Sequence, residues 1–332
     1  PDQSFDSMIT SLGWQASYEI NDHLAPYARM TWDKEHEDAA AEAFARSQSI
    51  VGSLPFAVPG QSFDDSYLTL QMGARTELFG MDANMLLAWH KYGGGKELLN
   101  KLYASINANV VSYPYGPMPT QPFGWFKKPI AKPEDIKGMK FRTVGLAVDM
   151  YTAMGAAVNP LPGGEIVPAL DRGLIDGAEF NNASSDRLLG FPDVVKNCML
   201  QSFHQSGEQF EILFNKAKYD GLPAELKAVI DYAVQAASAD MSWKAIDRNS
   251  KDYEELKKVG VKFYKTPDAV LRRQLEVWDE VTAKKSAENA LFKEVLDSQK
   301  AFAQRAKSWQ NDYMVDFNMA YNRYFRAPAK KA

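Results

Sequence analysis

The sequence predicts an α/β protein with two lobes around a shared ligand cleft. Three observations support this prediction. The chain has 332 residues, about twice the usual size of a single domain. Helical patterns alternate with short apolar strands between residues 82 and 215, which indicates a mostly parallel, wound sheet. A helical pattern then starts at Pro223 and continues without further Pro or Gly to Lys258, and at ~1.5 Å per residue it spans ~50 Å, enough to cross both lobes.

Composition limits the classes of function. The formal net charge is −4, so no basic face is implied and no nucleic-acid partner is expected. No apolar run reaches the ~18 residues that a membrane span needs. The chain starts at Pro1 without a basic and apolar leader, as in a secreted protein whose signal peptide has been removed, or in a trimmed sequence. The single cysteine, Cys198, excludes an internal disulfide and is expected to be a buried core thiol rather than a nucleophile.

The part of the chain before residue 123 contains three expected helices. A helical pattern covers Asp33 to Arg46. Asp82 is a suitable N-cap for a helix through Trp89, which the glycines at 93–95 end. The next helix has an apolar face made of Leu98, Leu99, Leu102 and Tyr103.

The remaining elements follow in regular alternation. Expected strands cover 123–126, 139–144, 158–161, 174–180 and 210–215. Expected helical segments cover 132–138, 146–154, 165–171, 267–283 and 287–313. The long helix after Pro223 is expected to bury one face, formed by Leu226, Val229, Ile230, Ala233, Ala237 and Met241.

The sequence contains few features that are typical of an enzyme. Its histidines, His23, His36, His90 and His204, are scattered, and no HExxH, GxSxG or CxxC motif is present. The triple glycine at 93–95 follows a helix rather than a strand, so it ends that helix and forms no phosphate loop. A protein that binds without catalysis is therefore expected.

Three polar residues stand at strand ends or turns in apolar surroundings. Arg142 lies at the end of an apolar strand, where its guanidinium could hold a carboxylate through two parallel bonds; an ordinary salt bridge is the alternative. Glu179 ends another apolar run, and a buried carboxylate needs a cation or several donors; a helix cap or ion pair is the alternative. Gln121 lies among prolines and is either a turn residue or a ligand contact.

Several segments carry a resemblance to a known family, in matching order over about three-quarters of the chain. They are residues 78–81, 89–95, 121–128, 135–142, 161–166, 169–180 and 203–205. These segments resemble the substrate-binding proteins of tripartite ATP-independent periplasmic (TRAP) transporters, in the branch that binds 2-oxo acids and includes mannitol/chloroaromatic-type members. The resemblance implies two α/β lobes that close on a small carboxylate, with a long helix crossing both.

The resemblance also implies residue roles. The residue that matches the family's carboxylate clamp is Arg142. Relatives that bind 2-oxo or 2-hydroxy acids add a metal ion, whose ligands match Gln121, Glu179 and the backbone carbonyl of Phe180. Ligation by oxygen alone suits Na⁺ or Ca²⁺. The other ligand-binding residues expected in this site are Asn181, Phe203 and Gln205.

The chain departs from the family pattern at three places. Phe180 stands where the family often has Trp, which removes an indole donor from the pocket. Gln205 replaces an acidic residue, which lowers the negative charge around a cation by one. Residues 1–77 lack the family's usual opening strand, helix and glycine-rich turn, so pocket residues cannot be transferred there.

We therefore expect the periplasmic solute-binding subunit of a TRAP transporter, with membrane subunits as partners and pyruvate or lactate as typical ligands. Lobe I is expected at 1–122 and 208–245, and lobe II at 123–207 and 246–332, including the C-terminal helices. The alternatives are an aromatic carboxylate as ligand, or a protein of the same fold in another uptake or sensing system. Both a monomer and a homodimer are compatible with the sequence.

Overall fold

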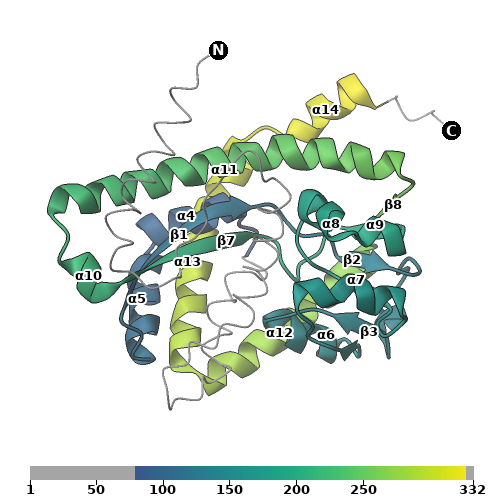
Figure 1. The fold of residues 1–332 in the computed structure, drawn as a ribbon, viewed down its shortest axis with the longest axis horizontal. Helices are drawn as coiled ribbons and strands as arrows, with labels where there is room; N and C mark the ends of the chain where they lie inside the picture. The colour runs from purple at the N-terminus through teal and green to yellow at the C-terminus, as the bar shows by residue number, and fades with distance from the viewer. Residues whose placement is uncertain (1–78, 327–332) are drawn as a thin grey trace. The chain divides into compact units, whose positions relative to one another are not determined.

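Residues 79–326 of the chain are described by a computed structural model (Figure 1). The chain divides into two units, one of residues 1–54 with 162–165 and one of residues 55–161 with 166–332. The elements below belong to the second unit, except that helix α7 begins in the first. The helix expected over residues 33–46 lies outside the described residues.

Two long antiparallel strands form the first sheet. They are β1 (Val110–Met118) and β7 (Glu208–Asn215), with Tyr113 opposite Ile212. The register shifts between Tyr115 and Met118, where Gly116 has a φ of +64° that other residues rarely adopt. Helices α4 (Ala83–Tyr92), α5 (Gly95–Ser105) and α10 (Lys216–Asp220) pack beside this sheet.

The expected cap of α4 is confirmed. Asp82 accepts a hydrogen bond of 2.9 Å from the N–H of Met85, and Gly93 ends the helix. This bond satisfies one of the donors that a helix leaves open at its start.

The second sheet has six strands in the order β4-β3-β5-β2-β6-β8. Their bounds are β2 (Gly124–Phe126), β3 (Lys140–Arg142), β4 (Ala157–Val158), β5 (Gly177–Ala178), β6 (Asn197–Leu200) and β8 (Lys262–Lys265). Strand β2 is antiparallel to both neighbours, and the other adjacent strands are parallel. The predicted mostly parallel sheet is confirmed, but the strand expected at 174–180 shortens to β5, because its neighbours β2 and β3 offer only three residues each.

Helices cover this sheet, and an aromatic cluster forms part of its core. The helical elements are η1 (Pro133–Ile136), α6 (Leu146–Ala153), α7 (Gly163–Asp171), α8 (Ala183–Leu189), α9 (Phe191–Val194) and α12 (Asp268–Glu288). Phe123, Phe126, Phe141 and Tyr151 are fully buried and contact one another through their rings. Cys198 is buried and free on β6, as expected, and burial raises the pKa of its thiol.

The predicted long helix is α11 (Ala224–Lys258), and it reaches both sheets (Figure 1). Its Ser238 Oγ accepts from the N–H of Gly116 in β1 at 3.2 Å, and its Asn249 Oδ1 accepts from the N–H of Ser184 in α8 at 3.1 Å. The expected buried face is wrong in part. Leu226 and Val229 are exposed, whereas the buried residues of α11 are Val234 and Leu256, because the helix rests on β1 and α8 along a different stripe.

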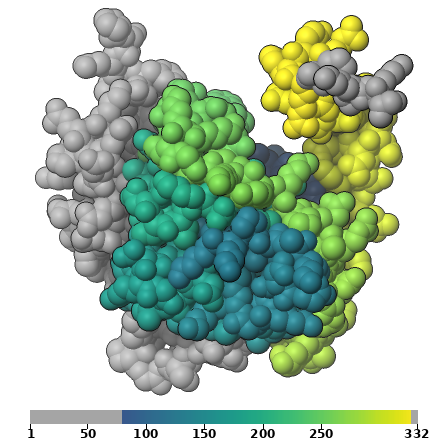
Figure 2. Space-filling model, turned by 90° about the vertical axis from the view of Figure 1, so that its right-hand side faces the viewer, coloured from purple at the N-terminus to yellow at the C-terminus, as the bar shows by residue number. Residues whose placement is uncertain are grey.

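The C-terminal helices divide between the two sheets. Helix α13 (Ala290–Tyr313) packs its Phe302 and Ala303 against α4, and Trp89 Nε1 donates to Ser298 Oγ at 3.1 Å. Helix α13 also packs against α12 and α5. Helix α14 (Phe317–Phe325) has no buried residue and stands at the surface in Figure 2. Among residues 79–326, no helix is both long enough and apolar enough to cross a membrane.

Candidate functional site

The centre of the site is a buried pair formed by Arg142 and Glu179. Strands β3 and β5 are parallel, with Arg142 opposite Ala178, so Glu179 follows directly at the same end of the sheet. Carboxyl ends of parallel strands are where α/β proteins bind ligands. Arg142 Nη1 lies 2.9 Å from Glu179 Oε1, and the two side chains are 6% and 2% exposed.

Two backbone carbonyl oxygens also accept hydrogen bonds from Arg142. Its Nε donates to Leu161 O and its Nη1 also donates to Glu179 O, both at 2.9 Å. Burial lowers the pKa of Arg142, and the Glu179 charge opposes that shift. Since guanidinium pKa values are so high, the group stays charged. Nη2 is thus the nitrogen that Arg142 can offer to a ligand while Glu179 stays in place.

Gln121 connects the crossover after β1 to the segment after β5. Its Nε2 donates to Phe180 O at 2.7 Å, and its backbone N–H donates to Gln205 O at 3.1 Å. The other amide atom, Oε1, lies 3.3 Å from His204 Nε2. A carboxamide oxygen only accepts, so His204 carries its proton on Nε2, and Nδ1 accepts from Ser202 Oγ at 2.7 Å.

His204 adds no positive charge to the site. Burial lowers its pKa to about 3, so the imidazole is neutral at physiological pH. Its 4.0 Å separation from Glu179 Oε2 is therefore a dipolar contact rather than an ion pair.

The three expected metal ligands lie close together. Gln121 and Phe180 O are hydrogen bonded, and His204 lies between Gln121 and Glu179. In this structure the side-chain nitrogen of Gln121 faces Phe180 O. A cation held by both Gln121 Oε1 and Phe180 O therefore requires the Gln121 amide group to flip. With this flip, one carboxylate, one amide oxygen and one carbonyl offer the oxygen donors that Na⁺ and Ca²⁺ prefer.

Asn181 joins the site to two buried carboxylates that the sequence did not single out. Its Nδ2 donates to Glu208 Oε2 at 2.9 Å, and its backbone N–H donates to Asp186 Oδ1 at 3.0 Å. Asp186 Oδ2 also accepts from Trp125 Nε1 at 2.7 Å. Burial raises the pKa of Asp186 to about 7, and the bond from Trp125 opposes the shift. In the sequence Asp186 reads as an ordinary acidic residue of a first helical turn, and Glu208 as a surface residue of a strand.

Gln205 and Phe203 lie on the return crossover. Gln205 is 7% exposed, and among the described residues its Nε2 has no hydrogen-bond partner. A buried donor without an acceptor is costly, so a ligand oxygen is a suitable partner for it. Phe203 is half-buried and lines an adjoining cavity of about 650 Å³ together with Gln121, Trp125 and Asn182. Direct hydrogen bonds join Arg142 to Glu179, and Gln121 to Phe180 and Gln205. Asn181 bonds instead to Asp186 and Glu208, and Phe203 faces that cavity.

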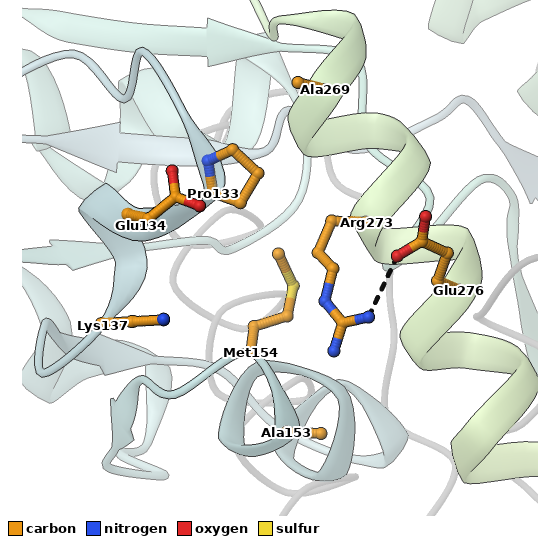
Figure 3. A pocket seen from close by; sticks show the side chains of 8 residues that line it. All are labelled: Pro133, Glu134, Lys137, Ala153, Met154, Ala269, Arg273 and Glu276. Carbon is orange, nitrogen blue, oxygen red and sulfur yellow. Dashed lines mark hydrogen bonds and ion pairs between the residues drawn. The ribbon is translucent and has the colours of Figure 1, made fainter.

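A smaller pocket of about 360 Å³ lies elsewhere, between η1, α6 and α12 (Figure 3). Its arginine, Arg273, is already bonded to Glu276 at 3.0 Å and to Glu280 at 3.3 Å. None of the expected site residues lines it.

Comparison with known sequences places most of the chain in one family. Residues 72–289 match the family model of the bacterial extracellular solute-binding proteins, family 7, and residues 1–80 match that of the autotransporter beta-domain. A monocarboxylate 2-oxoacid-binding periplasmic protein of a Nostoc species is 31% identical over 231 residues. This match covers 70% of the present chain and 63% of the relative.

Solved structures agree with the fold. A TRAP periplasmic solute-binding protein from Colwellia psychrerythraea, with bound calcium and pyruvate, is 30% identical with a TM-score of 0.70, covering 77% of this chain and 76% of that one. Another from Pseudoalteromonas atlantica, with bound sodium and pyruvate, is 25% identical with a TM-score of 0.72, covering 89% and 97%. The α/β periplasmic binding-protein fold is confirmed, and the expectation of a non-catalytic binder agrees with these relatives. The chain belongs to family 7 of the bacterial extracellular solute-binding proteins.

Proposed function

We propose that this protein is the periplasmic solute-binding subunit of a TRAP transporter and captures a 2-oxo or 2-hydroxy monocarboxylate such as pyruvate or lactate. One observation carries the proposal: the buried Arg142–Glu179 pair lies beside Gln121 and the Phe180 carbonyl. This arrangement offers a cation for the carboxylate and an oxygen set for a metal ion. Calcium and sodium accompany pyruvate in the two similar structures.

The proposed cation and ligand assist each other through Glu179. A carboxylate ligand and Glu179 place two negative charges against the one positive charge of Arg142, since His204 is neutral. Like charges in a poorly hydrated site repel strongly. A cation bound by Glu179 removes this repulsion and draws the carboxylate away from Arg142 Nη1. Both terminal nitrogens of Arg142 then become available to form a two-bond clamp on the ligand.

Isothermal titration calorimetry tests the proposal directly. The panel is pyruvate, lactate and an aromatic carboxylate, each titrated in Na⁺, in Ca²⁺ and after removal of both ions. We expect pyruvate or lactate to bind without turnover and the ions to strengthen binding. Binding of the aromatic acid alone would favour the alternative ligand class, and turnover of any panel member would contradict the proposal. An operon with small and large membrane-subunit genes would distinguish transport from sensing.

The two crossovers between the sheets are the proposed hinges of lobe closure. Gln121 N–H donates to Gln205 O, and Thr120 Oγ1 donates to Ser206 O at 2.7 Å, so the crossovers are joined to each other. The proposed lobes are 1–122 with 208–245 and 123–207 with 246–332. Small-angle scattering should show a smaller radius of gyration at saturating ligand. An unchanged radius would rule out closure.

A homodimer is the second proposed partnership. Five large apolar side chains of α14 are between 53% and 74% exposed, namely Phe317, Met319, Tyr321, Tyr324 and Phe325. An isolated helix this short is marginal in water, so α14 needs a covering surface. The exposed apolar side chains of α11, Tyr232, Trp243 and Ile246, provide one on a second copy.

Analytical ultracentrifugation tests this partnership. We expect the wild type to sediment as a dimer and Tyr324→Lys as a monomer. Tyr92→Lys, at an equally exposed tyrosine of α4, is the matched control and should remain a dimer. A monomeric wild type would contradict the dimer.

A further inference from the structure

Asp186 is a buried carboxylate that the proposed binding mechanism does not use. It lies in the first turn of α8, is 0% exposed, and each of its oxygens accepts one N–H. Oδ1 accepts from the Asn181 backbone at 3.0 Å, and Oδ2 accepts from Trp125 Nε1 at 2.7 Å. The positive charge of Arg142 lowers its pKa by acting through space.

The two hydrogen-bond partners of Asp186 differ in how firmly the fold holds them. Trp125 is fixed in the middle of β2, where it pairs with Ala178 on one side and Cys198 on the other. Its ring also stacks on Phe191, with centroids 5.4 Å apart and planes 27° apart. Asn181, by contrast, lies beyond the end of β5, outside any strand. Asp186 therefore ties an irregular segment to a rigid one.

The irregular segment carries the candidate site. Glu179 and Phe180 precede Asn181 directly, and α8 starts after Asn182, whose Oδ1 accepts from the N–H groups of Ser184 and Ser185. The turn of α8 thus holds Asp186 in place, and Asp186 holds Asn181. A one-ångström shift of a supporting residue can strongly weaken a site that depends on fixed geometry.

We propose that Asp186 is a positioning residue: held by the first turn of α8, it clamps the Asn181 N–H and so keeps Glu179 and the Phe180 carbonyl at the distance from Gln121 that ligand binding requires. The inference rests on the proposed function for its binding readout only. A carboxylate suits this place because both of its oxygens accept, whereas asparagine offers one acceptor and one donor. An asparagine here would turn its NH₂ group toward either the Asn181 N–H or the Trp125 indole N–H.

This clash provides a test that a purely structural role would not pass. The probe is pyruvate with Ca²⁺, measured by calorimetry at pH 8, above the Asp186 pKa of about 7, and at a temperature where each variant is folded. Asp186→Asn should weaken binding by about tenfold or more, the equivalent of one hydrogen bond. Trp125→Phe should stay within about threefold of the wild type, because Oδ1 keeps its bond to Asn181. Combining the two changes should restore affinity toward the wild type, since the NH₂ group then faces a ring that has no donor.

A second measurement keeps the inference independent of ligand identity. Hydrogen exchange of the Asn181 amide, without ligand, should be slow in the wild type and in Trp125→Phe, and faster in Asp186→Leu, which has no acceptor. Equal exchange of the Asn181 amide in the wild type and Asp186→Leu would overturn the clamp. A double variant that binds no better than Asp186→Asn would do the same. Failure of every carboxylate to bind the wild type would instead sink the proposed function, and the exchange result would still decide on Asp186.

Discussion

Arg142 and Glu179 form two hydrogen bonds through one nitrogen, because Nη1 reaches both the backbone oxygen and the carboxylate of Glu179 at 2.9 Å. The register of β3 and β5 produces this contact, and burial of both side chains shields it from water. The proposed ligand carboxylate takes over Nη1 from the Glu179 carboxylate once a cation binds Glu179. Removing either charge leaves the other one buried without its partner.

Replacing Arg142 should abolish most of the affinity. Loss of one partner of a buried pair costs ~3–5 kcal/mol, so Arg142→Ala should weaken pyruvate binding by at least about a hundredfold. Arg142→Lys should rescue only part, since an ammonium cannot form the two-bond clamp. Arg172→Ala, at an exposed arginine in the turn after α7 that donates to Pro168 O, is the control and should bind normally. Calorimetry on folded variants decides; near-wild-type affinity in Arg142→Ala contradicts the assigned role.

Replacing Glu179 should remove the dependence on metal ions. Glu179→Gln keeps the shape but loses the charge, so Na⁺ and Ca²⁺ should no longer strengthen ligand binding. Glu208→Gln is the matched control, because Glu208 is an equally buried carboxylate and a glutamine oxygen can still accept from Asn181 Nδ2. It should retain the ion dependence.

The ions are removed with chelator after partial unfolding, and elemental analysis confirms their removal. Ligand affinity is then compared with and without each ion. If the wild type binds equally well in every condition, Glu179 is a hydrogen-bonding residue only.

Local patterns in the sequence were sufficient for much of the fold. The Asp82 cap, the strand ending at Arg142 and the helix after Pro223 all depend on residues near one another in the chain. The buried face of α11 was predicted incorrectly in part, because that face depends on where β1 and α8 meet the helix. Strand lengths likewise depend on neighbours that are distant in sequence.

Some residues of the candidate site could be predicted from the sequence, and others could not. Arg142, Glu179 and Gln121 interrupt apolar or proline-rich runs, which makes them visible in the sequence. Asp186 and Glu208 acquire their roles only because folding brings Asn181 between them. No spacing in the chain predicts that contact.

Stability should fall in acid partly through His90. Burial lowers its pKa to about 4 from 6.5, so between these values the unfolded chain binds a proton that the folded protein does not. The free energy of unfolding therefore decreases as the pH falls through 6.5, by about 2 kcal/mol for this group at pH 5 relative to pH 8.

The His90 contribution is measured as a difference between variants. Urea unfolding of the wild type and His90→Gln at pH 8 and pH 5 should show a smaller acid loss in the variant. Asp186 acts in the opposite direction, since its raised pKa stabilises the folded state as the pH falls through about 7, but it is common to both proteins. Equal acid losses would show that His90 titrates normally.

Gly124 should tolerate no side chain, because β2 lies against β5 at this point. Its φ is +151°, and an added Cβ would lie 2.7 Å from Ala178 O, a backbone atom that cannot move aside. Gly138 is the matched control, since its φ of +72° is also unfavourable for other residues but nothing lies within 4 Å of an added Cβ. Gly138→Ala should therefore cost only the backbone strain of about 1–2 kcal/mol. Gly124→Ala should cost a further ~1–3 kcal/mol from overpacking and, by moving β5, should also weaken ligand binding at the adjacent Glu179. Urea unfolding and calorimetry of both variants check this, and equal losses of stability would mean that the approach of β2 to β5 leaves room for a methyl group.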